Sequence, residues 1–383
     1  MGNKKSNIFD YVMTQGNLSF QESEFNEVDA LVLSVFAYLD FSSIDAQEIV
    51  PFSEAIEGVN KLPEEFRFSG PTVDMMRSIV SLANDAVKTL RYRDMGVFNY
   101  THITDEKEEI QFAAVTFILP DDTAFISFRG TDNSLVGWKE DFNMSFIYGV
   151  PSQIKATKYA TETAKKVNRS MRLGGHSKGG NLAVWASTYL PKEYQESIIH
   201  IYSNDGPGFT KEFLNCPEYL NIRKKISFFV PVSSIVGVLM EHDEYTSICS
   251  TNPFIFQHDP FSWRIDGTHL LYGEAKTLYT KQFERVINSW IRAMSPKERE
   301  ELIDMSYNML TSSHAKTIDD LDKAKIKSFL SMQKTFRKMG LKKQRQLVLS
   351  LSKVIFNSDI LVNSNLFTLL SDNEESKEKD ISN

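Results

Sequence analysis

A glycine-rich run near the middle of this 383-residue chain restricts the possible folds more than any other feature. It reads Gly174-Gly-His-Ser-Lys-Gly-Gly180 and contains the pattern Gly-x-Ser-x-Gly, with Ser177 at its centre. Met171–Leu173 predicts a short strand before the run, and Leu182–Leu190 predicts a helix after it. Glycines two residues on either side of the serine allow a tight strand-to-helix turn without Cβ clashes. The sequence therefore predicts an α/β fold.

Short β-rich segments alternate with helical ones around this run. Strands separated by helices imply a mainly parallel sheet. The further strands are expected at Gln111–Leu119, Thr123–Phe128, Ile198–Ser203 and Ile226–Val230, with a helix at Ile154–Val167. Because only Pro120-Asp-Asp separates the strands at Gln111–Leu119 and Thr123–Phe128, we expect these two to form an antiparallel hairpin at an edge of the sheet.

The pattern of apolar and polar residues divides the chain into four segments. Residues 1–95 are mainly helical, 96–270 form the α/β core, 271–370 are helical again, and 371–383 form a polar tail expected to be disordered. In the third segment, Ser295-Pro-Lys-Glu298 combines a capping serine, a proline at the first helical position and a glutamate three residues after the cap. The other C-terminal helices are expected at Leu278–Met294, Leu321–Phe336 and Lys342–Phe356.

Composition argues against several classes of protein. The formal net charge is −7, which gives no general attraction to nucleic acid. Two cysteines, Cys216 and Cys249, cannot form a disulfide framework. We find neither a secretory signal nor a run of roughly 20 apolar residues able to span a bilayer. These features predict a cytoplasmic protein without a transmembrane segment, whose oligomeric state the sequence leaves open.

The environment of Ser177 suits a nucleophile. A sharp strand-to-helix turn exposes the hydroxyl, and the following helix directs its first backbone N–H groups at a developing oxyanion. A glycine-rich turn without chemistry is the alternative, but the flanking strand and helix fit the catalytic interpretation.

Two motifs resemble the class 3 (fungal-type) lipases. Gly-His-Ser-x-Gly-Gly-x-Leu-Ala around Ser177 is similar to their nucleophile turn, and Phe128-Arg-Gly-Thr-Asp-Asn-Ser-Leu-Val-Gly-Trp-Lys-Glu-Asp141 is similar to their Phe-Arg-Gly-(Ser/Thr)…Trp…Asp segment. The chain as a whole most resembles a bacterial family of lipase-like proteins of uncharacterised function that carry Ser-Lys in this turn. The resemblance covers residues 100–270 and implies an α/β-hydrolase fold.

The same resemblance implies an oxyanion hole. The residue after Arg129-Gly supplies one donor in the lipases, and the matching position here is Thr131, through its backbone N–H and its hydroxyl. The backbone N–H of Lys178 would be the second donor. Each such donor typically lowers a barrier by about 3–4 kcal/mol. Lysine replaces the apolar residue usual at position 178, and we expect its side chain either to be solvated or to favour an acidic group on the substrate.

A serine nucleophile needs a base, and three histidines are candidates. In α/β-hydrolases the base lies late in the chain, which leaves His242, His258 and His269. His258 lies in an apolar stretch interrupted by a proline turn, and it matches the late histidine of the resembling family. We therefore expect His258 to be the base and keep the other two as alternatives.

The acid departs from the lipase pattern. Class 3 lipases carry an aspartate after the strand that matches Ile226–Val230, whereas this chain has Ser233 and Ser234 there. Asp205, at the carboxyl end of the preceding predicted strand, lies at the edge where open α/β sheets form their sites. We expect Asp205 to be the acid. The alternatives are Asp243 and Asp259.

Together these features predict a serine esterase, lipase-like or thioesterase enzyme that forms an acyl-enzyme on Ser177. The expected partner is a small-molecule ester or lipid, and no metal or cofactor is implied. Phe254, Phe256, Phe261 and Trp263 are candidates for an acyl pocket. An inactive binding or scaffold protein is the main alternative, since the lipase aspartate is missing and fold alone does not prove activity. A serine peptidase is the third possibility.

Overall fold

A computed structural model describes residues 6–234, 236–273, 294–323, 325–338, 340–341 and 344–345. Eight strands form one sheet in chain order, antiparallel from β1 to β4 and parallel from β4 to β8. The strands are β1 Val50–Pro51, β2 Gly96–Asp105, β3 Ile110–Ile118, β4 Ala124–Phe128, β5 Met171–His176, β6 Ile198–Asn204, β7 Ile226–Pro231 and β8 Thr246–Ile248. The predicted α/β fold with a mainly parallel sheet is confirmed.

The predicted hairpin is present, but its position differs from the prediction. β3 and β4 pair antiparallel as expected, yet β2 and β1 continue the sheet beyond β3. β2 was not predicted, because its second half, Thr101–Asp105, is mostly polar and partly exposed. β3, in contrast, is buried along its whole length, as a central strand should be.

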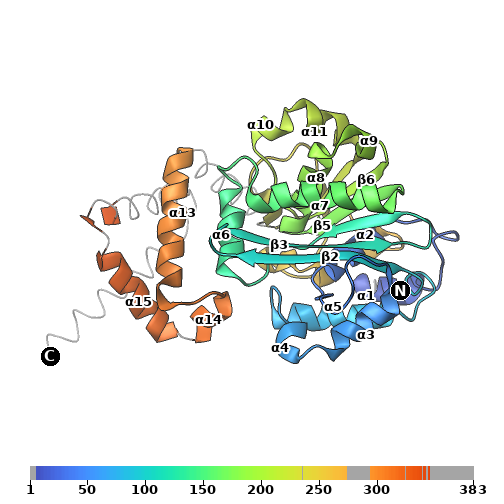
Figure 1. The fold of residues 1–383 in the computed structure, drawn as a ribbon, viewed down its shortest axis with the longest axis horizontal. Coiled ribbons are helices and arrows are strands. Elements are labelled where there is room, and N and C mark those ends of the chain that lie inside the picture. Colours follow the sequence, from blue (N-terminus) through green and yellow to red (C-terminus); the bar gives the residue numbers. More distant parts are fainter. Residues whose placement is uncertain are drawn as a thin grey trace.

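Helices cover both faces of the sheet (Figure 1). α7 (Pro151–Val167) and α8 (Lys178–Tyr189) pack on one face and share a core with the inner side chains of β3 to β7. The other face is covered by N-terminal helices that share a second core with the sheet. These helices are α1 Ile8–Gln15, α2 Glu27–Phe36, α3 Phe52–Lys61 and α5 Val73–Ala86.

A buried ion pair fixes these N-terminal helices. Asp29 in α2 and Arg91 are both fully buried, and their side chains form a two-pronged contact of 2.7 and 2.5 Å. The hydroxyls of Tyr11 and Tyr92 donate to the same carboxylate. Because every charge of the pair has a partner, α2 can lie buried against the sheet.

The C-terminal helices lie beside α6 (Leu135–Asn143), at one end of the molecule (Figure 1). α13 (Pro296–Leu310) begins with the predicted capping box between Ser295 and Glu298. The helix predicted at Leu321–Phe336 overlaps the end of α14 (Ile318–Lys323) and most of α15 (Lys325–Lys338), and residue 324 lies outside the described residues. Residues 278–293, most of Lys342–Phe356 and the tail 371–383 lie outside the described residues.

Short elements complete the described fold. In the part of the chain that the structure describes, no helix is both long enough and apolar enough to cross a membrane. The remaining elements are the helices α4 Glu64–Arg67, α9 Lys192–Gln195, α10 Lys211–Leu214 and α11 Pro217–Ile222, the 3-10 turns η1 Arg223–Lys225, η2 Val236–Val238, η3 Phe254–His258, η4 Pro260–Ser262 and η5 Thr311–Ser313, and the strand pair β9 Ile265–Asp266 and β10 His269–Leu270.

Candidate active site

Ser177 occupies a sharp turn between β5 and α8. Its backbone has φ 59° and ψ −135°, a conformation that costs energy for a residue with a side chain. The flanking glycines permit the turn: a Cβ on Gly175 would lie 2.3 Å from the carbonyl carbon of Gly179, and one on Gly179 would lie 2.0 Å from the Phe128 carbonyl oxygen. The predicted strand–serine–helix geometry is therefore present, and its strain is of the kind found at functional sites.

The start of α8 leaves the serine hydroxyl uncommitted to the helix. Ser177 is the N-cap of α8, but its side chain makes no capping hydrogen bond. Lys178 is the first residue of the helix, so its backbone N–H is one of the donors that a helix start leaves without an internal partner. A negative oxygen placed above Ser177 would face this N–H.

His258 and Asp205 come together although 53 residues separate them. Nδ1 of His258 lies 2.6 Å from Oδ2 of Asp205. Asp205 is fully buried, whereas the His258 side chain is 28% exposed. Because a carboxylate only accepts hydrogen bonds, Nδ1 carries the hydrogen and the lone pair of neutral His258 is on Nε2.

Ser234 explains how the site is built without the lipase aspartate. Its hydroxyl donates to the same Oδ2 of Asp205 at 2.7 Å and accepts the backbone N–H of Gly237 at 3.1 Å. The other oxygen of Asp205 packs on Gly237, where an added Cβ would lie 2.2 Å from it. The loop after β7 thus holds a carboxylate that comes from the end of β6.

The other candidate residues lie elsewhere. His242 packs against Phe228 and Tyr245, and His269 is exposed beside Glu27. Asp243 forms an ion pair with Arg223. Asp259 follows His258 but accepts a hydrogen bond from the Phe261 N–H at the start of η4, and burial raises its pKa. Among the residues proposed from sequence, the structure pairs His258 with Asp205 and places His258 and Ser177 on the wall of one cavity.

The Thr131 side chain is engaged in a way that the sequence did not predict. Its hydroxyl donates to Oδ2 of Asp141 at 2.6 Å, so the hydroxyl hydrogen points at this carboxylate rather than at a substrate. The backbone N–H of Thr131 remains the candidate donor. Burial raises the pKa of Asp141 to about 6, although nearby Lys178 and the Thr131 hydrogen bond oppose the shift. The signal was present, since Asp141 ends the segment that resembles the lipases.

The Lys178 side chain is neither solvated nor directed at an acidic substrate group, and both expectations are wrong. It is buried, and its Nζ donates to the backbone and side-chain oxygens of Gln111 at 2.8 and 2.7 Å. It also forms an ion pair of 3.1 Å with Glu140, which is equally buried. Oxygens of the protein therefore satisfy the ammonium group, and the backbone N–H of Lys178 is left as the candidate donor.

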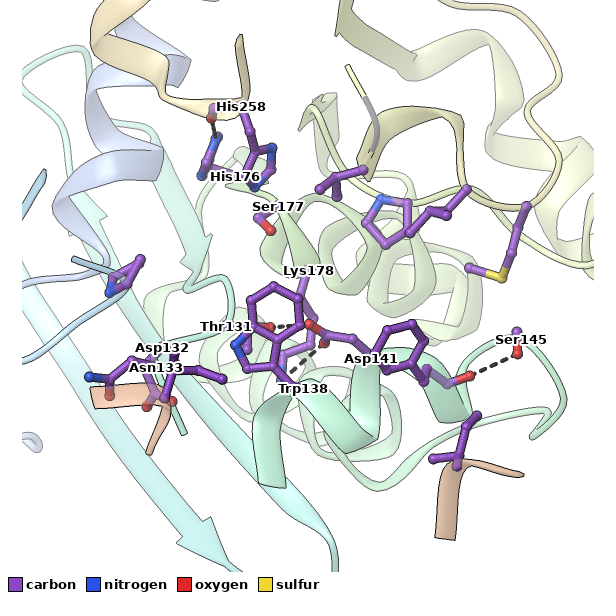
Figure 2. Close-up of a pocket in the computed structure, with 18 of the residues that line it drawn as sticks. Thr131, Asp132, Asn133, Trp138, Asp141, Ser145, His176, Ser177, Lys178 and His258 are labelled. Atoms are coloured by element: carbon purple, nitrogen blue, oxygen red, sulfur yellow. Dashed lines mark hydrogen bonds and ion pairs between the residues drawn. The ribbon is translucent and has the colours of Figure 1, made fainter. Parts of the chain in front are cut away.

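A cavity of about 390 Å³ contains these groups. Figure 2 shows Ser177, His176 and His258 in one part of it, and Thr131, Trp138 and Asp141 in another. Its apolar lining comes from α5, α6, the loop after β7 and the C-terminal helices, and includes Met75, Trp138, Phe142, Leu239, Met294, Leu302 and Ile318. The expected aromatic lining is wrong for the residues whose side chains are described: Phe256 is exposed, Phe261 packs on the core, and Trp263 is buried. The Phe254 side chain lies outside the described residues.

A family model and several solved structures are similar to this chain. A search of curated proteins finds no match. M37 lipase is similar in structure at 16% identity and a TM-score of 0.37, over 56% of this chain and 70% of that one. The Rhizomucor miehei lipase in its propeptide complex is similar at 13% identity and a TM-score of 0.35, over 61% and 76%. A family model described as Mbeg1-like matches residues 86–308, more than half of the chain. The chain therefore belongs to the Mbeg1-like family.

Proposed function

We propose that this protein is a serine hydrolase that cleaves carboxylic esters or thioesters through an acyl-enzyme on Ser177. The 2.6 Å contact between Asp205 and His258 carries the proposal, because it orients the imidazole within the cavity that Ser177 also lines. A serine on a strained turn, a histidine with a free Nε2 and a buried carboxylate have the roles of a nucleophile, base and acid.

The proposed reaction has two halves. Nε2 of His258 takes the Ser177 proton while Oγ attacks the ester carbonyl, and the negative oxygen that forms accepts the backbone N–H groups of Thr131 and Lys178. Collapse of this intermediate expels an alcohol or thiol, which receives the proton from His258. A water then gives its proton to His258 and attacks the acyl-enzyme, releasing the acid and restoring Ser177.

The cavity indicates which part of the substrate it holds. About half of the residues that line the cavity are apolar, and a site of about 390 Å³ is of the size that binds small molecules. An acyl chain buried there loses contact with water, at a gain of about 0.8 kcal/mol per CH₂. We propose an apolar acyl group, and the lipid or other alcohol to which it is joined remains open.

An inactive binding protein is the other candidate function. Its support was that Ser233 and Ser234 stand where the lipases have an aspartate. This support weakens because Asp205 contacts His258 in place of that aspartate, and Ser234 donates a hydrogen bond to Asp205. A peptidase would use the same groups, so the choice of leaving group separates it from an esterase.

The test is hydrolysis of chromogenic esters with trapping of the intermediate. We expect turnover with wild-type protein, and a mass increase equal to the acyl group on the peptide containing Ser177 after rapid acid quench. His258→Gln should lower kcat by at least about a thousandfold. Turnover that survives in Ser177→Ala would contradict the proposal, and preferential cleavage of matched amides would favour the peptidase.

A further inference from the structure

A buried tyrosine of the N-terminal segment meets the candidate site. Tyr38 follows α2 by two residues and is 2% exposed. Its hydroxyl lies 3.1 Å from Nδ1 of His176, the residue before the nucleophile. Gly130 packs closely against this hydroxyl, since a Cβ on Gly130 would lie only 2.1 Å from it. One hydroxyl thus contacts the nucleophile turn and the residue that precedes Thr131.

His176 extends this contact to the base. Its Nε2 lies 2.9 Å from the carbonyl oxygen of His258, and the two imidazole rings are tilted by 31° with centroids 4.6 Å apart (Figure 2). A carbonyl oxygen only accepts, so Nε2 of His176 carries the hydrogen. Nδ1 must then accept the hydrogen of Tyr38. A single tautomer satisfies both contacts.

The protonation states fit this arrangement. Burial and the neighbouring His258 lower the pKa of His176 well below its ordinary value, so the ring is neutral. Burial also raises the pKa of Tyr38, so its hydroxyl keeps the hydrogen that it donates. A neutral His176 adds no repulsion when His258 takes up a proton during the proposed reaction.

We infer that Tyr38 is a positioning residue that, through His176, aligns the oxyanion loop, the nucleophile turn and the base of the proposed hydrolase. The inference rests on the proposed function. It gives the N-terminal helices a part in the chemistry, since α2 leads directly into Tyr38. Two further contacts hold the backbone next to the base: Trp263 Nε1 donates to the Gln257 carbonyl at 2.8 Å, and the Ser233 N–H donates to the Gln257 side chain at 2.8 Å. Loss of the Tyr38 hydroxyl should therefore misalign the Ser177 turn and the His258 imidazole, while the backbone around Gln257 stays in place.

The test is a double-mutant cycle in the full-length protein with Tyr38→Phe and His176→Gln. Tyr38→Phe keeps the ring and removes the hydroxyl, and we expect kcat on a chromogenic ester to fall about tenfold or more with KM changed less than about twofold, because misplacement by a fraction of an ångström is costly. His176→Gln keeps a donor for the His258 carbonyl but loses the ring. If the two residues act as one chain, the double variant should be no slower than the worse single variant.

The matched control is Tyr11→Phe. Tyr11 is equally buried in the N-terminal segment, and among the described residues its hydroxyl forms hydrogen bonds with Asn26 and Asp29, outside the site. It should lose stability to urea and keep the wild-type kcat. A Tyr38→Phe variant with wild-type kcat, or effects of the two substitutions that simply add, would overturn the inference while the proposed function stands. A wild-type protein without esterase activity would instead refute the proposed function.

A measurement of the His176 tautomer adds a readout independent of turnover. In protein labelled with nitrogen-15 histidine, we expect Nε2 of His176 to be protonated and Nδ1 to be a bare acceptor whose shift changes in Tyr38→Phe. Protonation at Nδ1 in the wild-type protein would contradict the inferred chain of contacts.

Discussion

Ser234 and His258 share one oxygen of Asp205, and this arrangement makes the serine hydroxyl a partner of the proposed acid. The carboxylate is fully buried and cannot be solvated, so each hydrogen bond to it stabilises its charge. A hydrogen bond to a charged group contributes about 1.5–3 kcal/mol. Ser234 should therefore affect turnover although it does not face the substrate.

We predict that Ser234→Ala lowers kcat on a chromogenic ester about tenfold, with KM nearly unchanged, because about 1.4 kcal/mol of lost orientation corresponds to this factor. Ser233→Ala is the matched control, since the contact of Ser233 with Gln257 uses its backbone N–H and survives the substitution. Steady-state kinetics on both variants decide the matter. Equal losses in the two variants would show that the loop matters and the hydroxyl does not.

Asp141 should make stability depend on pH. Burial raises its pKa from 3.8 to about 6, so between these values the folded state holds a proton that the unfolded state has lost. The contribution of this group to stability then falls as pH rises from about 4 to 6 and is constant above that. Asp141→Asn should consequently be more stable than wild type at pH 7, by about 1–3 kcal/mol, and equally stable near pH 4.

Urea unfolding at several pH values measures this difference. Asp132→Asn provides a control of opposite sign. Burial opposes ionisation of Asp132, but Arg129 and hydrogen bonds from Ser134 outweigh it and hold its pKa below the ordinary value. This variant should be less stable than wild type at pH 7, with a difference that shrinks as the pH falls. A destabilised Asp141→Asn at pH 7 would contradict the interpretation.

Sequence predicts a site residue best when the residues next to it in the chain determine its geometry. The turn at Ser177 could be predicted from its neighbours in the chain, since Gly175 and Gly179 permit the tight backbone conformation there. The pairing of His258 with Asp205 depends on how β6 and the loop before η4 pack, so sequence could only rank the candidates. The contact of Tyr38 with the candidate site could not be predicted, because a buried tyrosine after an apolar helix is expected in any protein core.

At the scale of elements, Glu140 connects four of them. Its carboxylate accepts from Lys178 at the start of α8, from the Gln111 N–H in β3 and from the Ser152 N–H in the first turn of α7. Because Lys178 and Glu140 are fully buried, neither charge can turn to water when its partner is removed.

We predict that Lys178→Met lowers the free energy of unfolding by about 3–5 kcal/mol, since it leaves the Glu140 charge buried and uncompensated by a cation. Adding Glu140→Gln should recover part of the loss. Lys158→Met breaks an exposed pair with Glu162 and should change stability by about 0.5 kcal/mol or less. Chemical denaturation of the three variants provides the comparison. A Lys178→Met protein as stable as the Lys158→Met control would rule out a structural role for the buried pair.

The elements at the centre of the fold could be predicted, because the predicted helices Ile154–Val167 and Leu182–Leu190 correspond to α7 and α8 and the predicted strands correspond to β3 to β7. β2 was not predicted because half of it is polar. Without β2, the β3–β4 hairpin was wrongly predicted to lie at the edge of the sheet. The capping box at Ser295 placed the start of α13 correctly, since caps are local signals. The cavity could not be predicted, because its walls come from elements distant in sequence.

At the scale of the whole molecule, distant segments close around Ser177. α5 supplies Met75, α6 supplies Trp138, and α13 supplies Leu302 to the same cavity. The C-terminal helices are held there by backbone contacts, because the Leu135 N–H donates to the Lys316 carbonyl and the Ile318 N–H donates to the Asn133 carbonyl. Their position next to the proposed oxyanion loop makes them candidates to limit the length of the proposed acyl chain.

We predict that Leu302→Trp, which places a larger side chain in the cavity, lowers kcat/KM for a laurate ester relative to a butyrate ester by about tenfold or more. Leu330→Trp on α15 is the control, since Leu330 is exposed and does not line the cavity. The ratio of rates on the two p-nitrophenyl esters is the measurement. An unchanged ratio in Leu302→Trp would place the acyl chain elsewhere.

The most direct test of the central claim is labelling by a fluorophosphonate, which reacts with activated serines. The account predicts that the wild-type protein is labelled, that the adduct maps to the peptide containing Ser177, and that Ser177→Ala and heat-unfolded wild type are not labelled. Native protein that resists labelling, or Ser177→Ala that is labelled equally well, would contradict it.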